Sequence, residues 1–240
     1  ILSELPNTFK PAPCSYLMSE TPNPAHSSAY IHPPEKYFIF SRLIQRCHIV
    51  FDTNILSIPM SSKSQQEAHR EDLITGLETR IPITDPRVYS EAKSIPHIAE
   101  HDRLMTLVAE SRRPEPEGFK EAFDYIKDIA LEVGVMGNKP SDVTDVRLAA
   151  RAYLLPRTRP VLATADHKLC DMILTINTEF LEGRAPACIT PKKRLVRPWC
   201  MHPLAGLFIP WYGEEDYQAR IAYLKETGVI SKPKEAPCPA

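Results

Sequence analysis

The chain has 240 residues, of which 43% are hydrophobic, so it is long enough to bury one substantial core and is not disordered throughout. Its formal net charge of -1 excludes a generally basic surface, and any contact with nucleic acid would depend on local basic patches. No apolar run approaches the roughly 20 residues that a membrane span needs, which predicts a protein without a membrane-spanning helix.

Residues 1–45 contain seven prolines, all between Pro6 and Pro34, and this composition favours extended backbone over helix. We expect an N-terminal arm here, ordered by its own domain or by a partner, with a short helix near Glu35–Gln45 before the first strand. The chain starts at Ile1 instead of methionine, so we expect an upstream segment, such as a targeting peptide, to have been removed or to lie outside this sequence. The nucleus or nucleolus, the cytoplasm and the mitochondrion all stay open as locations.

Short apolar runs alternate with amphipathic segments over residues 46–190, which we interpret as one domain. The predicted strands lie at 49–51, 80–84, 160–164 and 187–190. Helices are predicted between them, with the strongest periodicity over Phe119–Val133. Strands that alternate with helices specify a parallel sheet covered on both faces, so the predicted class is α/β.

Residues 191–240 are interpreted as a C-terminal extension with a last helix near Asp216–Thr227. We expect the 46–190 domain to close its core without this extension or the N-terminal arm. The six cysteines lack the close spacing of a zinc knuckle or a redox motif, so reduced thiols are predicted. Cys188, Cys200 and His202 offer three zinc ligands, but their spacing is unspecific and a zinc site is the less favoured interpretation.

Four acidic residues occupy comparable places along the domain. Asp52 and Asp166 directly follow predicted strands, whereas Glu91 and Asp145 lie on predicted helices. Each has an ordinary structural explanation: a strand-end Asp can cap a turn, and a helix acid can complement the dipole or face water. In an open parallel sheet, however, ligands bind beyond the carboxyl ends of the strands. Together the four acids therefore favour a functional site, and Asp142 is a fifth acid on the same helix as Asp145.

Each of the four acids lies in a short motif: Phe51–Asn54, Ile81–Asp85 with Val88–Glu91, Thr144–Ala152, and Ala163–Asp166. Together the motifs resemble those of the PIN-domain nucleases, and their residue patterns are most similar to those of the members that process ribosomal RNA. The resemblance covers residues 46–190. It implies a three-layer sandwich with a central parallel sheet of four to five strands between helices, to which the terminal arms are added.

The resemblance implies a metal-dependent endoribonuclease that matures ribosomal or other RNA within a ribonucleoprotein particle. Crowded carboxylates repel one another, and Mg²⁺ or Mn²⁺ relieves that repulsion through oxygen ligands. The bound metal would activate water and stabilise charge on the scissile phosphate. The implied catalytic and metal-binding residues are Asp52, Glu91, Asp145 and Asp166, with Asp142 as an alternative ligand.

Candidate contacts to RNA surround this acidic set. Hydroxyl and amide side chains would orient the carboxylates or the phosphate, and cationic side chains would bind the backbone. The candidates are Thr53, Asn54, Thr164, Arg147, Arg151, Lys168, Lys192, Lys193 and Arg194. Trp199 and Trp211 are available for base stacking, although tryptophans between prolines more often pack on their own domain.

Three alternatives compete with the nuclease. A phosphatase of the haloacid-dehalogenase type needs a second Asp two residues after the first, where this chain has Asn54. A receiver domain needs paired acids on its first strand and a late lysine, and neither pattern is clear. The strongest alternative is a PIN fold kept as a structural or assembly subunit of a ribosome or its precursor. In either PIN interpretation, the arms would contact other proteins of the particle.

Overall fold

The computed structural model describes residues 37–57, 62–132, 134, 140–155, 160–189 and 195–230, all within one compact unit. Most of the predicted N-terminal arm and the basic cluster at Lys192–Arg194 lie outside the described residues. The end of the arm is described, and the short helix expected there is α1 (Phe40–Arg46). Within the described part, no helix is both long and apolar enough to cross a membrane.

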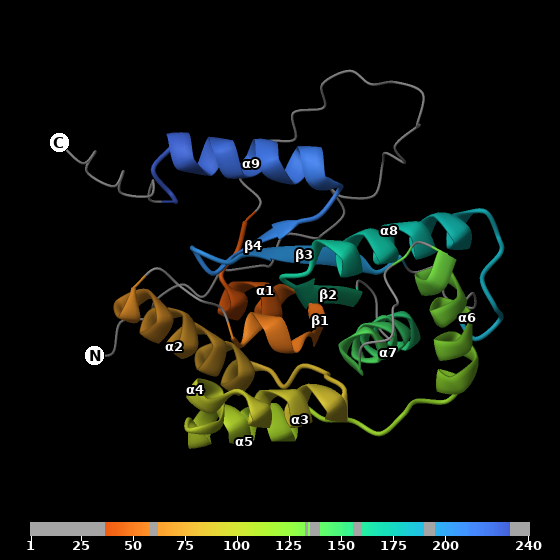
Figure 1. Cartoon of the computed structure of the whole chain (residues 1–240), viewed down its shortest axis with the longest axis horizontal. Helices are drawn as coiled ribbons and strands as arrows, with labels where there is room; N and C mark the ends of the chain where they lie inside the picture. The colour runs from red at the N-terminus through yellow and green to blue at the C-terminus, as the bar shows by residue number, and fades with distance from the viewer. Residues whose placement is uncertain are drawn as a thin grey trace, which may run out of the picture. The chain divides into compact units, whose positions relative to one another are not determined.

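The centre of the fold is a four-stranded, mostly parallel sheet (Figure 1). Its strands are β1 (His48–Phe51), β2 (Pro160–Thr164), β3 (Arg197–His202) and β4 (Leu207–Pro210), in that spatial order. The β1–β2 and β2–β3 pairs are parallel, and β3–β4 is antiparallel. The predicted α/β class is confirmed.

Helices make up most of the remaining described chain. They are α2 (Lys63–Thr79), α3 (Pro86–Ser94), α4 (Pro96–Ala99), α5 (Asp102–Glu110), α6 (Phe119–Glu132), α7 (Pro140–Leu154), α8 (His167–Leu181) and α9 (Glu214–Glu226), with the short 3-10 turn η2 (Thr53–Ile55) after β1. The start of α3 is fixed by its sequence, since Asp85 accepts a hydrogen bond from the Arg87 N–H at 3.0 Å and Pro86 takes the first helical position.

Both faces of the sheet are covered, because every residue of β2 is buried. Side chains alternate between the faces along β3. Cys200 packs in a cluster with Tyr217, Ile221 and Leu224 of α9, while its neighbour Met201 belongs to the main core. α7 packs against β1 and β2, and α9 covers β3 and β4 (Figure 1). The arrangement is compatible with a three-layer sandwich.

Two of the four predicted strands are wrong. Residues 80–84 form only isolated bridges, in which the Ile83 N–H donates to the Ile49 oxygen at 3.0 Å. Pro82 has no N–H to give, and Ile81 is half exposed, so no continuous pairing develops. The predicted strand at 187–190 is a turn over residues 187–189, closed by a 3.0 Å bond from the Ile189 N–H to the Pro186 oxygen. Strand β3 follows several residues later.

Two strands that follow residue 190, β3 and β4, are part of the sheet. The expected domain boundary at 190 falls between β2 and β3, which pair directly from Val161↔Arg197 to Thr164↔Cys200. Trp199 and Trp211 are both buried, and the Trp211 Nε1–H donates to Asp171 Oδ1 at 2.8 Å. These tryptophans therefore contribute to the core and offer no face for base stacking.

Candidate active site

The parallel pairing of β1 and β2 aligns the ends of the two strands. Phe51 lies opposite Ala163, and the Asp52 N–H extends the ladder with a 3.1 Å bond to the Ala163 oxygen. Asp52 and Thr164 thus meet at the carboxyl edge of the sheet. Asp52 is 5% exposed and Thr164 is fully buried, so both are fixed within the floor of the site.

The Thr164 hydroxyl joins the motif after β1 to the motif after β2. It donates to Asp52 Oδ2 at 2.9 Å, and it accepts from Asn54 Nδ2 and from the Asp166 N–H, each at 3.0 Å. Asn54 Oδ1 in turn accepts from the Ala165 N–H at 2.8 Å. Thr164 and Asn54 therefore fix the orientation of the Asp52 carboxylate.

Glu91 enters the site from α3 and is held at both oxygens. Thr53 Oγ donates to Glu91 Oε2 at 2.5 Å, and Thr144 Oγ, from α7, donates to Oε1 at 2.6 Å. The two bonds fix the plane of the carboxylate and connect three elements. Thr144 was not among the predicted site residues, although it stands directly before Asp145 in the third motif, which is a usable sequence signal.

A pocket of about 570 Å³ lies over these groups. The structure brings all five predicted acids to it. Its lining residues are Asp52, Thr53, Asn54, Ser57, Glu91, Ser94, Ile95, Asp142, Asp145, Asp166, His167 and Lys168. Ser57, Ser94, Ile95 and His167 were not predicted. Of these, His167 had a sequence signal, because it directly follows Asp166 in the last motif.

Burial and repulsion between carboxylates raise the pKa of two of these acids. Desolvation is the largest cause for Asp145, and together with the charges of Asp52, Asp166, Glu91 and Asp142 it raises the pKa of that residue to about 8. Burial also raises the pKa of Asp52 to about 6, although the Thr164 hydrogen bond opposes that shift. A cation placed among these carboxylates would reverse both effects, since it favours their charged forms.

Asp166 has a structural role as well as a place in the pocket. It is the N-cap of α8, where Oδ1 accepts from the Lys168 N–H at 2.8 Å and from the Leu169 N–H at 3.3 Å. The cap uses one carboxylate oxygen and fixes the side chain at the pocket. The capping interpretation and the site interpretation of this residue are therefore both compatible with the geometry.

The predicted RNA contacts Arg147 and Arg151 do not line the pocket. Their Nε atoms lie 3.0 and 2.7 Å from Oδ2 of Asp85, which is fully buried. Burial alone would raise the pKa of Asp85, but the hydrogen bonds from both arginines and from the Arg87 N–H leave it lowered. Arg147 also pairs with Glu115 at 2.7 Å. These arginines link α7 to the start of α3, so Lys168 is the described member of the predicted cationic set that reaches the pocket.

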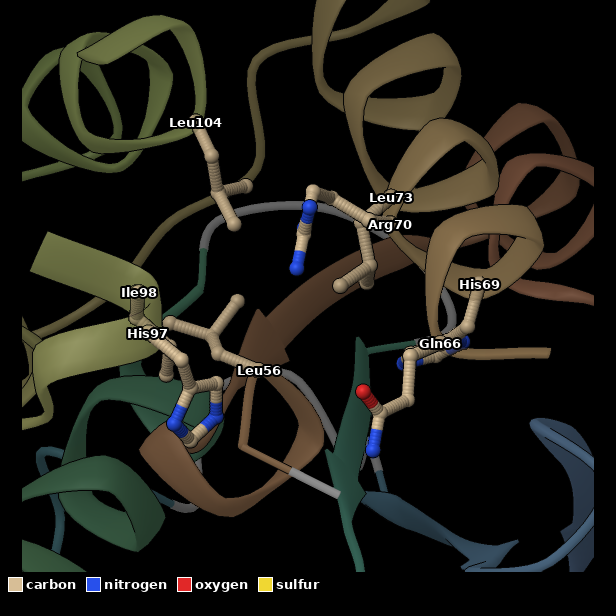
Figure 2. A pocket seen from close by; sticks show the side chains of 8 residues that line it. All are labelled: Leu56, Gln66, His69, Arg70, Leu73, His97, Ile98 and Leu104. Atoms are coloured by element: carbon tan, nitrogen blue, oxygen red, sulfur yellow. The ribbon is translucent and has the colours of Figure 1, made fainter. Parts of the chain in front are cut away.

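A second pocket lies between α2, α4 and α5, beside the turn that follows η2 (Figure 2). Figure 2 shows Gln66, His69 and Arg70 of α2 facing His97 and Leu104 across it. Its volume of about 20 Å³ holds little more than one water molecule. The His69 ring nitrogen Nε2 lies 2.9 Å from the Ile55 oxygen, which fixes the start of α2 against η2. We assign this pocket a packing role.

The donor set of the larger pocket fits a hard divalent cation. Carboxylate oxygens are the ligands that Mg²⁺ and Mn²⁺ prefer. Among the described residues, no three His, Cys, Asp or Glu side chains form a ready-made metal cage, and this includes Cys188, Cys200 and His202. Mg²⁺ usually binds through one or two carboxylates, several waters and the substrate phosphate, an arrangement that needs no such cage.

Comparison of the chain with protein-family models, with curated proteins and with solved structures found no match.

Proposed function

We propose that this protein is a metal-dependent endoribonuclease with a PIN-like active site. The observation that carries the proposal is the meeting of Asp52, Glu91, Asp145 and Asp166, which come from four separate parts of the chain, around one open pocket. The carboxylates repel one another, and a bound cation would relieve this repulsion. Hydrolysis of phosphodiesters is the chemistry that such a cation, held by carboxylates at a sheet edge, supports best.

The roles of the carboxylates follow from their partners. Asp52, Asp145 and Asp166 would hold Mg²⁺ or Mn²⁺, directly or through water. Asp142, which lies on α7 with Asp145, is an alternative ligand. The metal, when bound, supplies activation of water and stabilisation of charge on the phosphate. Glu91 differs from the other three because two threonine hydroxyls already bind it. We assign Glu91 to orienting the attacking water, and Thr53 and Thr144 to holding Glu91 in position.

Lys168 is the described lysine that lines the pocket, and its side chain is exposed. We assign it to a backbone phosphate of the RNA. We assign Arg147 and Arg151 a structural role, because both pair with Asp85.

Cleavage of labelled single-stranded RNA by the purified chain tests this function. We expect cleavage with Mg²⁺ or Mn²⁺ and none with EDTA. Asp52→Asn and Asp145→Asn should each lower the rate by about 100-fold or more, because each removes a charge that holds the metal.

Asp124→Asn is the matched control, since Asp124 is an exposed acid on α6 that pairs with Lys120 and lies outside the pocket. It should cleave at the wild-type rate. Wild-type protein that binds RNA and metal without cutting would contradict the nuclease and favour the assembly subunit. Equal cleavage by wild type and Asp52→Asn would show that a contaminant cuts the RNA.

A further inference from the structure

His167 is a pocket residue that the carboxylate chemistry does not use. It is the first residue of α8, directly after Asp166, and its side chain is 38% exposed. Its Nδ1 lies 2.8 Å from Oε2 of Glu214, at the start of α9. An ionised carboxylate has no hydrogen to give, so the contact is favourable when Nδ1 carries the proton. In the neutral tautomer that this contact selects, Nε2 presents a lone pair.

The imidazole ring is also fixed by packing. Its centroid lies 4.5 Å from the Trp211 ring and 5.0 Å from the Tyr217 ring. Trp211 is itself held by the hydrogen bond from its Nε1 to Asp171. A ring with a carboxylate on Nδ1 and aromatic groups beside it cannot turn freely. The imidazole ring therefore has a defined position in the lining of the pocket.

The lone pair on Nε2 limits which groups of a substrate His167 can bind through a hydrogen bond. A lone pair accepts a hydrogen bond, and phosphate oxygens at neutral pH have no hydrogen to donate. Mg²⁺ prefers oxygen ligands, so the imidazole is a poor candidate for the metal itself. On a nucleic-acid backbone, the ribose 2′-hydroxyl is the donor near each phosphate, and it is the group that distinguishes RNA from DNA.

We propose that His167, positioned by Glu214 and Trp211, accepts a hydrogen bond from a ribose 2′-hydroxyl and so makes the site selective for RNA. This inference rests on the proposed function, because it takes the strand in the pocket to be a nucleic acid. It assigns His167 a direct contact with the substrate, and it assigns Glu214 a positioning role.

Binding measurements test the inference separately from catalysis. The full chain carrying Asp52→Asn is titrated in Mg²⁺ with one short single-stranded RNA and with the same sequence bearing 2′-fluoro groups, which cannot donate a hydrogen bond. We expect the RNA to bind about three- to tenfold more tightly, the range for one hydrogen bond. Adding His167→Phe, which keeps a flat ring against Trp211, should abolish the difference. Adding Glu214→Gln should reduce it.

His97→Ala is the control histidine, because His97 is exposed and lies outside this pocket. It should leave the RNA preference unchanged. Equal weakening of RNA and 2′-fluoro RNA by His167→Phe would overturn the inference in favour of a phosphate contact. A preference that survives His167→Phe would also overturn it.

Cleavage separates the two proposals. If wild type cuts RNA but His167→Phe keeps the same ratio of RNA to 2′-fluoro RNA cleavage, the nuclease stands and the His167 contact falls. If wild type does not cut, but Asp52→Asn protein prefers RNA through His167, the contact stands and the nuclease falls. An absence of RNA binding would overturn both.

Discussion

Asp145 combines partial burial with the charges of four neighbouring acids, and its pKa moves from 3.8 to about 8. Between about pH 4 and pH 8 the folded protein therefore holds a proton that the unfolded chain has lost. The contribution of this group to the free energy of unfolding is complete below the unfolded pKa, and it is lost as the pH rises through the folded pKa. Asp52, with a pKa of about 6, adds to the same trend.

Asp145→Asn removes the free-energy cost of ionising this partly buried carboxyl at high pH. In EDTA we expect the variant to melt at a higher temperature than wild type at about pH 8, with the difference shrinking towards about pH 4. Mg²⁺ or Mn²⁺ should raise the melting temperature of wild type more than that of the variant, because binding stabilises the folded state by mass action. Asp124→Asn provides the baseline. A variant less stable than wild type at both pH values would assign Asp145 a structural role.

The position of a site residue could be predicted where the neighbouring sequence alone places that residue in the fold. Asp52 and Asp166 follow apolar runs, so their place at the sheet edge could be predicted from the order of the chain. The structural roles of Arg147 and Arg151 could not be predicted in this way. Their four-residue spacing puts both on one face of α7, but no local pattern reveals that Asp85, far away in sequence, is buried against that face.

Helices α1 and α2 are in close contact. Asp72 of α2 caps α1, since its Oδ2 accepts from the Phe40 N–H at 2.7 Å. Gly76 permits the approach. A Cβ at this position would lie 2.6 Å from Cδ1 of Phe40 and 3.2 Å from the backbone of Ser41. The packing of α1 on α2 therefore depends on a glycine inside a helix.

Gly76→Ala tests that contact. Alanine favours helix over glycine by about 1 kcal/mol, but overpacking against the fully buried Phe40 should cost about 1 to 3 kcal/mol. We expect a net loss of stability, measured by urea unfolding. Thr75→Ala, at the exposed neighbouring position of α2, should change stability little. If Gly76→Ala were as stable as Thr75→Ala, the close packing of the two helices would be contradicted.

Helices were easier to predict than strands for a physical reason. The periodicity of α6 is contained in its own sequence, whereas a strand is defined by partners elsewhere in the chain. Residues 80–84 have a suitable composition but form only isolated bridges. β3 contains Pro198 and lies in the segment interpreted from the sequence as a C-terminal extension, yet it pairs with both β2 and β4. Such long-range pairing could not be derived from local pattern.

The α/β class and the acidic pocket could be predicted from the alternation of strands and helices. The residues at which the folded domain begins and ends could not. A protein that ends at residue 189 would lack β3, β4 and α9. It would expose the buried edge of β2 and the apolar faces of α8, so we expect it to be insoluble or to unfold without a cooperative transition. Residues 37–230 should fold. Cooperative melting of the shorter protein would contradict this expectation.

The pairing of Phe38 with Phe208 bears on how the protein behaves at high concentration. Two backbone hydrogen bonds of 2.9 and 2.7 Å join these residues, so Phe38 is bridged to the outer edge of β4. Unpaired N–H and C=O groups on an edge strand are a template for another chain. Phe38 also stacks on Trp199, with 5.4 Å between ring centroids, which anchors the segment in place. The bridge at Phe38 thus occupies one position on the outer edge of β4, which leaves fewer of its backbone groups open to pairing between copies.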